Sequence, residues 1–386
     1  MLPSPWATAR RRASSLLVLL VALTGCSDDD PERAAGPSSS AETTEAAEEP
    51  EERAPLQSFT TRPDLTPPVI EVLDASSPSP GFLFLAPKQA QVQTGPIIVD
   101  DRGELVWSKP LPERRSAADF RVQTYQGRPV LTWWEGVSHR GWGEGDFVIA
   151  DETYTEIARF PAGNGRQGDL HEMQLTEDGT ALVLVYEEQA ADLSELGGPA
   201  EGREFENYVQ EIDVATGELL WEWRASDHVD RATTYVGFDE PEVGTEEDPF
   251  DWFHVNSAGL WDGDTVIVSA RNTHAIYAFH RRTGALEWTL GGKASDFELG
   301  DGARFAWQHD ARRQPDGTLS LFDNQSNSDE EPDARALVLR VDEEAMTATV
   351  VREQPHPEGV RSRTQGNAQL LADGGLVVGW GSEGRV

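Results

Sequence analysis

The sequence predicts an all-β protein, a β-propeller of about six four-stranded blades. Turn-forming residues are abundant, with 35 glycines and 24 prolines, and alternating apolar runs separated by Asp-Gly dipeptides recur along the chain. An Asp-Gly turn between alternating apolar runs is a strong signal for a β-hairpin. Two kinds of hairpin alternate, which gives four strands per repeat. An open array of the same hairpins is the alternative, but a closed propeller protects the edges of its sheets.

The first 25 residues are expected to be a lipoprotein signal peptide. Three arginines at positions 10–12 precede an apolar run at 16–23 that is too short to span a bilayer. The run leads to Cys26, the only cysteine, in a Leu-Thr-Gly-Cys sequence that resembles the lipidation box of bacterial lipoproteins. We therefore expect a lipid on Cys26 and an extracytoplasmic protein that is lipid-anchored to the bacterial cell membrane.

Residues 26–64 are expected to be an acidic, disordered linker, and residues 65–386 the propeller. Between residues 27 and 54 the chain holds acidic residues in large excess over arginine and no aromatic residue. Such a segment cannot bury enough apolar surface to offset the entropy lost on ordering. The linker would hold the folded part away from the membrane.

The charge and the single cysteine exclude several classes of function. A formal net charge of −36 argues against nucleic acid as a partner, because phosphate binding requires basic patches. It argues equally against binding to anionic lipid through surface charge. One cysteine excludes an intramolecular disulfide and a cysteine-based zinc site. The sequence does not specify the oligomeric state.

One of the two hairpin types begins at a polar residue and returns through an Asp-Gly turn into an apolar strand. Its clearest copies begin at His171, His254, His309 and Gly366. Two acidic, Gly-containing stretches, 187–206 and 227–249, interrupt the spacing of the repeats and are expected to be surface loops on one rim.

Three of the eight histidines stand at the same position of successive repeats. In a propeller these positions lie where the innermost strands begin, so we expect His171, His254 and His309 to meet near the central axis. Arg271 ends the hairpin that His254 begins, and antiparallel pairing should place these two residues side by side. His139 is expected near the same rim. The remaining histidines are expected to be solvated: His228, His274, His280 and His356.

Three histidines and an arginine around one cavity suggest two kinds of chemistry. Three histidines can hold a zinc ion with an open coordination position. However, a guanidinium beside a dication is costly unless an anion lies between them, and we find no Asp at a clear partnering position for these histidines. The alternative is a metal-free anion site, in which one histidine is the nucleophile, another is the general acid, and Arg271 holds anionic oxygens. Such a site suits transfer of a sulfuryl or phosphoryl group.

Several segments resemble the arylsulfotransferase family, in an order that covers most of residues 95–381. The segments are Leu170–Met173, Asp251–Ser257, Ser269–Asn272, Trp288–Gly292, Gln308–Arg312 and Ser362–Asn367. The resemblance implies a six-bladed propeller outside the cytoplasm. It also implies transfer of a sulfuryl group from an aryl sulfate ester to a phenol, without a nucleotide sulfate donor. We expect these small molecules as partners, and neither a cofactor nor a metal.

The resemblance implies a role for each residue of the site. His309 resembles the histidine that becomes sulfated, and His254 resembles the partner that stabilises or protonates the transferred group. Arg271 and Asn256 resemble the groups that bind sulfuryl oxygens. His171 resembles the other channel histidine that contacts the substrate.

Two further features follow from comparison with the same family. Thr364 lies where an additional polar contact with the substrate is expected. The chain stops at Val386, soon after a Gly-Trp-Gly element beyond which family members usually continue. The last blade is therefore expected either to be incomplete or to be closed by a strand near Val69–Val72.

Two other functions compete with sulfuryl transfer. The first is a non-catalytic binding or scaffold lipoprotein, because the segment 213–221 also resembles the Trp-docking turn of quinoprotein-like propellers. The second is another enzyme on this fold, such as a lyase or a sulfate-ester hydrolase. The aligned histidines favour an enzyme over a scaffold, and the fold alone does not decide among these functions.

Overall fold

The computed structural model describes residues 55–386 except 75–79, 89–92 and 327–332. The expected signal peptide, the lipidation site Cys26 and the linker up to residue 54 lie outside the described residues and stay predictions. Within the part of the chain that is described, no helix is long and apolar enough to cross a membrane.

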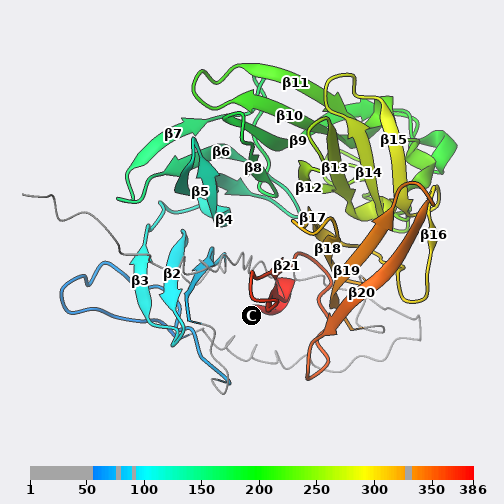
Figure 1. Cartoon of the computed structure of the whole chain (residues 1–386). Coiled ribbons are helices and arrows are strands. Elements are labelled where there is room, and N and C mark those ends of the chain that lie inside the picture. The colour runs from blue at the N-terminus through cyan, green and yellow to red at the C-terminus, as the bar shows by residue number, and fades with distance from the viewer. Residues whose placement is uncertain (1–54, 75–79, 89–92, 327–332) are drawn as a thin grey trace, which may run out of the picture.

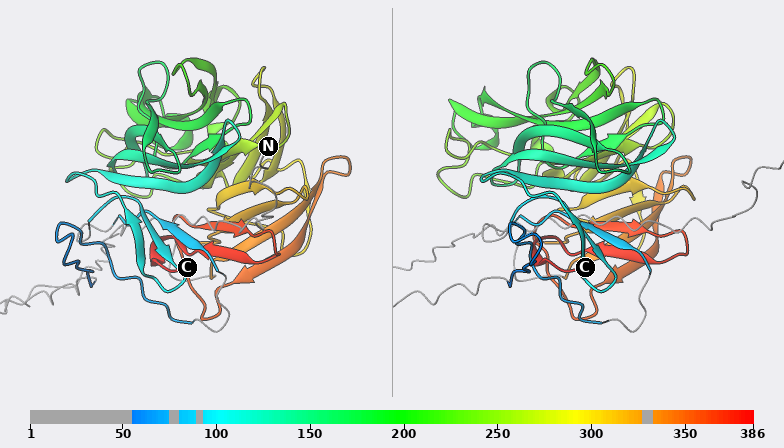
Figure 2. Two further views of the ribbon diagram at one scale, coloured as in Figure 1. Left: turned by 60° about the vertical axis from the view of Figure 1, so that its left-hand side comes forward. Right: turned by 90° about the vertical axis from the view of Figure 1, so that its left-hand side faces the viewer.

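The described chain forms sheets of mainly antiparallel strands arranged around a central axis (Figure 1), and Figure 2 gives two further views of them. Three sheets have four strands each: β4–β7 (Ser116–Tyr125, Arg128–Ser138, Gly143–Ala150, Glu156–Phe160), β8–β11 (Met173–Leu175, Thr180–Ala191, Gly202–Asp213, Leu219–Arg224) and β12–β15 (Val255–Leu260, Thr265–Ala270, Ala275–His280, Leu286–Gly291). A fourth consists of β17–β20 (His309–Arg313, Leu319–Asp323, Arg335–Asp342, Thr347–Pro355), to which β16 (Glu298–Leu299) adds in parallel. The β-propeller predicted from the hairpin repeats is confirmed.

The two ends of the described chain supply smaller sheets. β1–β3 (Phe82–Leu85, Ile97–Asp100, Leu105–Ser108) form a three-stranded sheet, and β21–β22 (Asn367–Leu370, Leu376–Gly379) form a two-stranded hairpin. The described residues thus form five blade-sized sheets and one hairpin, so the expected count of about six four-stranded blades is slightly too high. The segment near Val69–Val72 is not a strand, although Ile70 packs with Val377 on the sheet β1–β3.

The apolar cores lie between neighbouring sheets. Alternate residues of β13 show this arrangement, since its successive side chains point to opposite faces. Val266 and Val268 belong to a core that β9 also enters with Leu184, whereas Ile267 belongs to a core that β18 enters with Leu321. Every residue of β13 is buried, which explains its near-continuous apolar sequence.

The hairpin turns form where Asp-Gly was found in the sequence. Gly179, Gly317 and Gly374 adopt positive φ angles of 80°, 83° and 85°, which glycine tolerates without steric cost. In the first of these turns the backbone N–H of Thr176 donates to Thr180 O at 2.9 Å. Each turn returns the chain into the second strand of its sheet.

The expected surface loop at 187–206 is a loop only over 192–201, and its two flanks are β-strand, contrary to the sequence prediction. β9 and β10 extend beyond the other strands of their sheet and pair in unbroken register from Thr180 with Asp213 to Ala191 with Gly202. Glu204 and Glu206 are buried, with basic residues beside their carboxylates. This burial explains how an acidic sequence can form a strand here. The stretch 227–249 is irregular, as expected, and Arg231 pairs there with Glu204.

The described chain also contains short 3₁₀ helices. They are η1 (Ser194–Leu196), η2 (Ala225–Asp227), η3 (Arg231–Thr233), η4 (Arg271–Thr273) and η5 (Gly381–Glu383).

A row of hydrogen bonds joins each innermost strand to the next, and we call it the inter-blade belt. In each link, a side-chain oxygen of one strand accepts from a backbone N–H of the following strand. The links are Asp119 to Met173 (2.8 Å), Glu172 to Ala258 (3.2 Å), Ser257 to Ala311 (3.1 Å) and Asp310 to Ala368 (3.1 Å). The belt thus runs from β4 through β8, β12 and β17 to β21.

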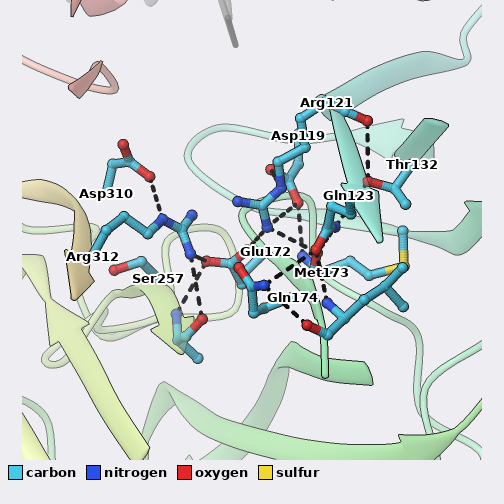
Figure 3. A network of polar contacts seen from close by, with 12 residues as sticks. Asp119, Arg121, Gln123, Thr132, Glu172, Met173, Gln174, Ser257, Asp310 and Arg312 are labelled. Carbon is cyan, nitrogen blue, oxygen red and sulfur yellow. Dashed lines mark hydrogen bonds and ion pairs between the residues drawn. The ribbon is translucent and has the colours of Figure 1, made fainter. Parts of the chain in front are cut away.

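Two arginines neutralise the acids of the belt (Figure 3). The fully buried Glu172 contacts Arg121 on one side and Arg312, at 2.5 Å, on the other. Arg121 also reaches Asp119 at 3.2 Å, and Arg312 reaches Asp310 at 2.7 Å. Because buried charges are tolerated only when they are paired, these contacts allow acids to line the axis of the propeller.

Candidate active site

The three aligned histidines converge, as the repeat predicted. His309 begins β17, His254 directly precedes β12, and His171 lies two residues before β8. The rings of His171 and His254 are 5.2 Å apart between centroids, and Tyr186 packs against both at 5.9 and 5.8 Å. Tyr186, which the sequence analysis did not single out, thereby fixes the spacing of the two histidines.

A cavity of about 720 Å³ opens beside this cluster. His171, His309 and Asn256 contribute to its wall, and the two arginines of the inter-blade belt lie further along it. The described lining contains many amide side chains but no Phe, Tyr or Trp. A small anion in this cavity would meet His171, His309 and Asn256 together.

Two of the histidines have carboxylate partners, contrary to the sequence analysis. His171 Nδ1 lies 2.6 Å from Asp169 Oδ2, which also accepts from the His171 backbone N–H at 3.0 Å. His254 Nδ1 makes a short contact with Asp251. Alternation along a strand did not exclude these acids, because both lie in the loop before the strand, where the chain folds back. The Asp-x-His and Asp-x-x-His spacings are the sequence signal that was missed.

His309 differs from the other two because its partner is an amide. His309 Nδ1 lies 2.8 Å from Asn324 Oδ1, and the backbone N–H of Gln365 donates to Nε2 at 3.1 Å. The histidine is 5 % exposed and Asn324 is 1 % exposed. Asn324 was not identified from the sequence, although the pairing of β17 with β18 places the end of β18 beside His309.

Burial lowers the pKa of His309 well below its ordinary value of 6.5, and the positive charge of Arg271 lowers it further. Burial also lowers the pKa of His254, but Asp251 acts against that shift by favouring the charged ring. The electrostatics therefore favour a neutral His309 and allow His254 to take up a proton more readily.

Arg271 lies beside His254, as antiparallel pairing predicted. The backbone N–H of Arg271 donates to His254 O at 2.9 Å. Its guanidinium donates to Asn272 Oδ1 at 2.9 Å and to Arg363 O at 3.1 Å, and it stacks over Trp307 at 4.8 Å from the ring centroid. These contacts hold the guanidinium in one orientation next to the histidines.

The two expected substrate-binding residues are placed differently. Asn256 lines the cavity, and its Nδ2 donates to Gln308 O at 2.7 Å. Thr364 contributes its carbonyl oxygen to local turns, accepting from Ser362 Oγ at 3.0 Å and from the Ser382 N–H at 3.2 Å. The cavity wall at this point is formed by the neighbouring Gln365.

Not all of the remaining histidines are solvated. His274 is half-buried, with its ring stacked on Tyr235 at 3.9 Å and edge-on to Trp307 at 4.4 Å. Burial, with Arg271 as the next cause, lowers the pKa of His274 to about 4. The prediction that His274 is solvated is therefore wrong, because Tyr235 of the 227–249 stretch covers the turn before β14 in which His274 lies. His139 stacks on Trp142 at 4.3 Å.

The chain is thus a propeller with three histidines and an arginine clustered beside one cavity. His171 and His309 line that cavity, whereas His254 and Arg271 are not among its described lining residues, so the expectation that all four surround one cavity holds only in part. Among the described residues, no group of three or more His, Cys, Asp or Glu side chains could hold a metal ion. The family model for arylsulfotransferase (ASST) matches residues 121–386. The chain therefore belongs to the arylsulfotransferase family, as its site motifs predicted.

The individual relatives are more distant. No curated protein matches the chain. Among solved structures, it is similar to a protein of unknown function from Bacteroides caccae, at 13% identity over 69% of this chain and 76% of that chain, with a TM-score of 0.42. It is also similar to virginiamycin B lyase from Staphylococcus aureus, at 9% identity over 77% of this chain and 80% of that chain, with a TM-score of 0.37.

Proposed function

We propose that this protein is a sulfotransferase that moves a sulfuryl group from an aryl sulfate ester to a phenolic acceptor through a sulfohistidine at His309. The family supports an arylsulfotransferase-type activity in general. The observation that carries the finer proposal is the division among the histidines: His309 has a neutral partner, whereas His171 and His254 have carboxylates. Groups whose surroundings drive their pKa values apart are suited to opposite roles in acid–base chemistry.

In the first step, the Nε2 lone pair of His309 attacks the sulfur of the aryl sulfate. An N–S bond forms while the bond between sulfur and the phenolic oxygen breaks. Protonated His254, or His171, gives its proton to the departing oxygen, and Arg271 offsets the charge on the sulfuryl oxygens. Asp251 favours the protonated form of His254 that this role requires, although burial lowers the pKa of that histidine.

In the second step, the acceptor phenol attacks the sulfur of the sulfohistidine. The histidine that gave up its proton takes the phenolic proton, and the N–S bond breaks. The product is a new aryl sulfate, and both histidines return to their starting states. The cycle needs no nucleotide, redox partner or external acid, because each half-reaction reverses the proton transfer of the other.

A chromogenic aryl sulfate tests this function directly. We expect release of the coloured phenol to accelerate when an acceptor phenol is added, and the His309→Ala variant to lose that release. His228→Ala is the matched control, since His228 is exposed and lies away from the cavity. Release that depends on water alone would indicate a hydrolase, and full activity of His309→Ala would exclude His309 as the nucleophile.

We further propose that the mature protein is anchored outside the cytoplasm through a lipid on Cys26. The apolar run and the Leu-Thr-Gly-Cys sequence support this location. In cells, Cys26→Ser should move the protein from the membrane fraction to a fraction released by osmotic shock or into the medium. Retention of the variant on the membrane would contradict the proposal.

A further inference from the structure

We propose that Asn324 is a positioning residue that holds His309 as a single tautomer, with hydrogen on Nδ1 and the lone pair on Nε2. Its link to catalysis rests on the proposed function, in which Nε2 is the attacking atom. The tautomer itself follows from the contacts alone.

The orientation of the Asn324 amide is set by two carbonyl groups. Its Nδ2 donates to Ser362 O at 2.7 Å and to Gln365 O at 3.0 Å, which uses both of its N–H bonds. The oxygen of the amide must therefore be the atom that faces His309 Nδ1, at 2.8 Å. An amide oxygen can only accept, so the hydrogen of this bond belongs to Nδ1.

A second contact, on the other nitrogen of the ring, requires the same tautomer. The backbone N–H of Gln365 donates to His309 Nε2 at 3.1 Å. A backbone N–H can only donate, so Nε2 must carry the lone pair. One acceptor and one donor, on opposite sides of the ring, thus require the same tautomer. A substrate must displace the Gln365 amide before Nε2 can attack.

The charged surroundings explain why an amide, rather than a carboxylate, fits this position. Three titratable or charged side chains face His309: Arg271, His171 and His254. On its own strand, Asp310 is directed to the Ala368 N–H and to Arg312 instead. The amide fixes the proton position, and its tendency to raise the pKa of His309 is outweighed by burial and by Arg271. A carboxylate would raise that pKa more strongly and favour a proton on the attacking nitrogen.

Nitrogen NMR on protein carrying ¹⁵N-labelled histidine tests the tautomer without relying on activity. The signals of His309 are assigned by their loss in His309→Gln. We expect wild-type protein near neutral pH to show a protonated Nδ1 and an unprotonated Nε2. A protonated Nε2 would overturn the inference.

The Asn324→Ala variant tests the consequence for chemistry. In this variant only the Gln365 N–H still favours the original tautomer, and a bound substrate displaces it. We therefore expect His309 to populate the other tautomer in part, and the first-turnover release of phenol to slow by about 10- to 10⁴-fold with little change in KM, because a misplaced proton removes the attacking lone pair. Asn164→Ala is the control, since Asn164 is exposed. An unchanged tautomer and rate would contradict the assignment.

The two measurements separate the inference from the proposed function. If Asn324→Ala does not fold, the wild-type spectrum still decides the tautomer. A protonated Nδ1 in a protein whose His309 is never sulfated would refute the proposed function and leave the assignment of Asn324 intact. A protonated Nε2 together with sulfation of His309 would refute the assignment of Asn324 and leave the proposed function intact.

Discussion

Small differences between neighbouring side chains give three otherwise similar histidines different surroundings. Two have a carboxylate at Nδ1, and one has an amide. A carboxylate stabilises an imidazolium more strongly than a neutral amide does. In the proposed mechanism, one residue type can therefore supply both the acid and the nucleophile.

Arg271 should stabilise the charge of the sulfuryl group in the transition state. We expect Arg271→Ala to lower kcat/KM for an aryl sulfate by about 10²- to 10³-fold, as loss of a preorganised donor to a developing anion usually does. Arg271→Lys should recover only part of this loss, because an ammonium lacks the planar fork of a guanidinium. Steady-state kinetics measure both, with the exposed Arg282→Lys as control. Wild-type kinetics in Arg271→Ala would contradict this role.

Asp251 should set the pH range in which His254 acts as an acid. Asp251 raises the pKa of His254 against the effect of burial, so Asp251→Asn should lower that pKa. Because the acid form is lost as the pH rises through the pKa, the alkaline limb of the rate should move to lower pH, by about one unit. The pH profile of phenol release measures the shift, and the exposed Asp101→Asn is the control. An unmoved limb would show that another group supplies the proton.

The sequence predicted the residues of the site better than it predicted their partners. His171, His254 and His309 could be found because they recur at one position of a repeat, and Arg271 because antiparallel pairing is a local rule. Asn324 could not, since its role depends on the side-chain packing of the next strand. Asp169 and Asp251 lie in loops, where the rule that successive side chains of a strand point to opposite faces does not apply.

Among the strands, the inter-blade belt explains why an acidic residue directly follows two of the three aligned histidines. Glu172 and Asp310 directly follow His171 and His309, and their side chains bond to the next innermost strand. The belt thus fixes the strands that carry the histidines relative to one another. The sequence showed these acids, but only the folded structure shows that they point across a blade junction.

Glu172 is the link of the belt whose loss should cost most. We expect Glu172→Gln to lower the free energy of unfolding by about 3 kcal/mol, because it leaves the half-buried Arg121 and Arg312 without their shared, fully buried counter-charge. Urea unfolding measures this change, with the exposed Glu177→Gln in the same hairpin as control. A difference below about 0.5 kcal/mol between the two variants would show that the belt carries little stability.

At the scale of the whole molecule, the charge opposes the proposed substrate. The chain carries a formal net charge of −36, whereas an aryl sulfate is an anion. The attraction must therefore be local, from the histidines and arginines in and beside the cavity. The propeller was predictable because its hairpins repeat, but the length of the terminal sheets was not, since closure depends on contacts between the two ends of the chain.

The acidic surface should give the enzyme an unusual dependence on salt. We expect KM for an anionic aryl sulfate to fall when sodium chloride is raised from about 10 mM to about 150 mM, because the Debye length shortens from about 30 Å to about 8 Å and screens the repulsion. The KM for an uncharged phenol acceptor is the control and should change little. A KM for the aryl sulfate that rises with salt would indicate attraction by the protein surface instead.

The central claim is that His309 carries the sulfuryl group between donor and acceptor. Its most direct test is mass spectrometry of peptides from protein mixed with an aryl sulfate and quenched in alkali, which preserves a bond between sulfur and imidazole nitrogen. We expect a sulfuryl group on the peptide that contains His309, and this group should disappear when a phenol is added before the quench. A modified peptide elsewhere, or none while phenol is being sulfated, would exclude His309 as the carrier.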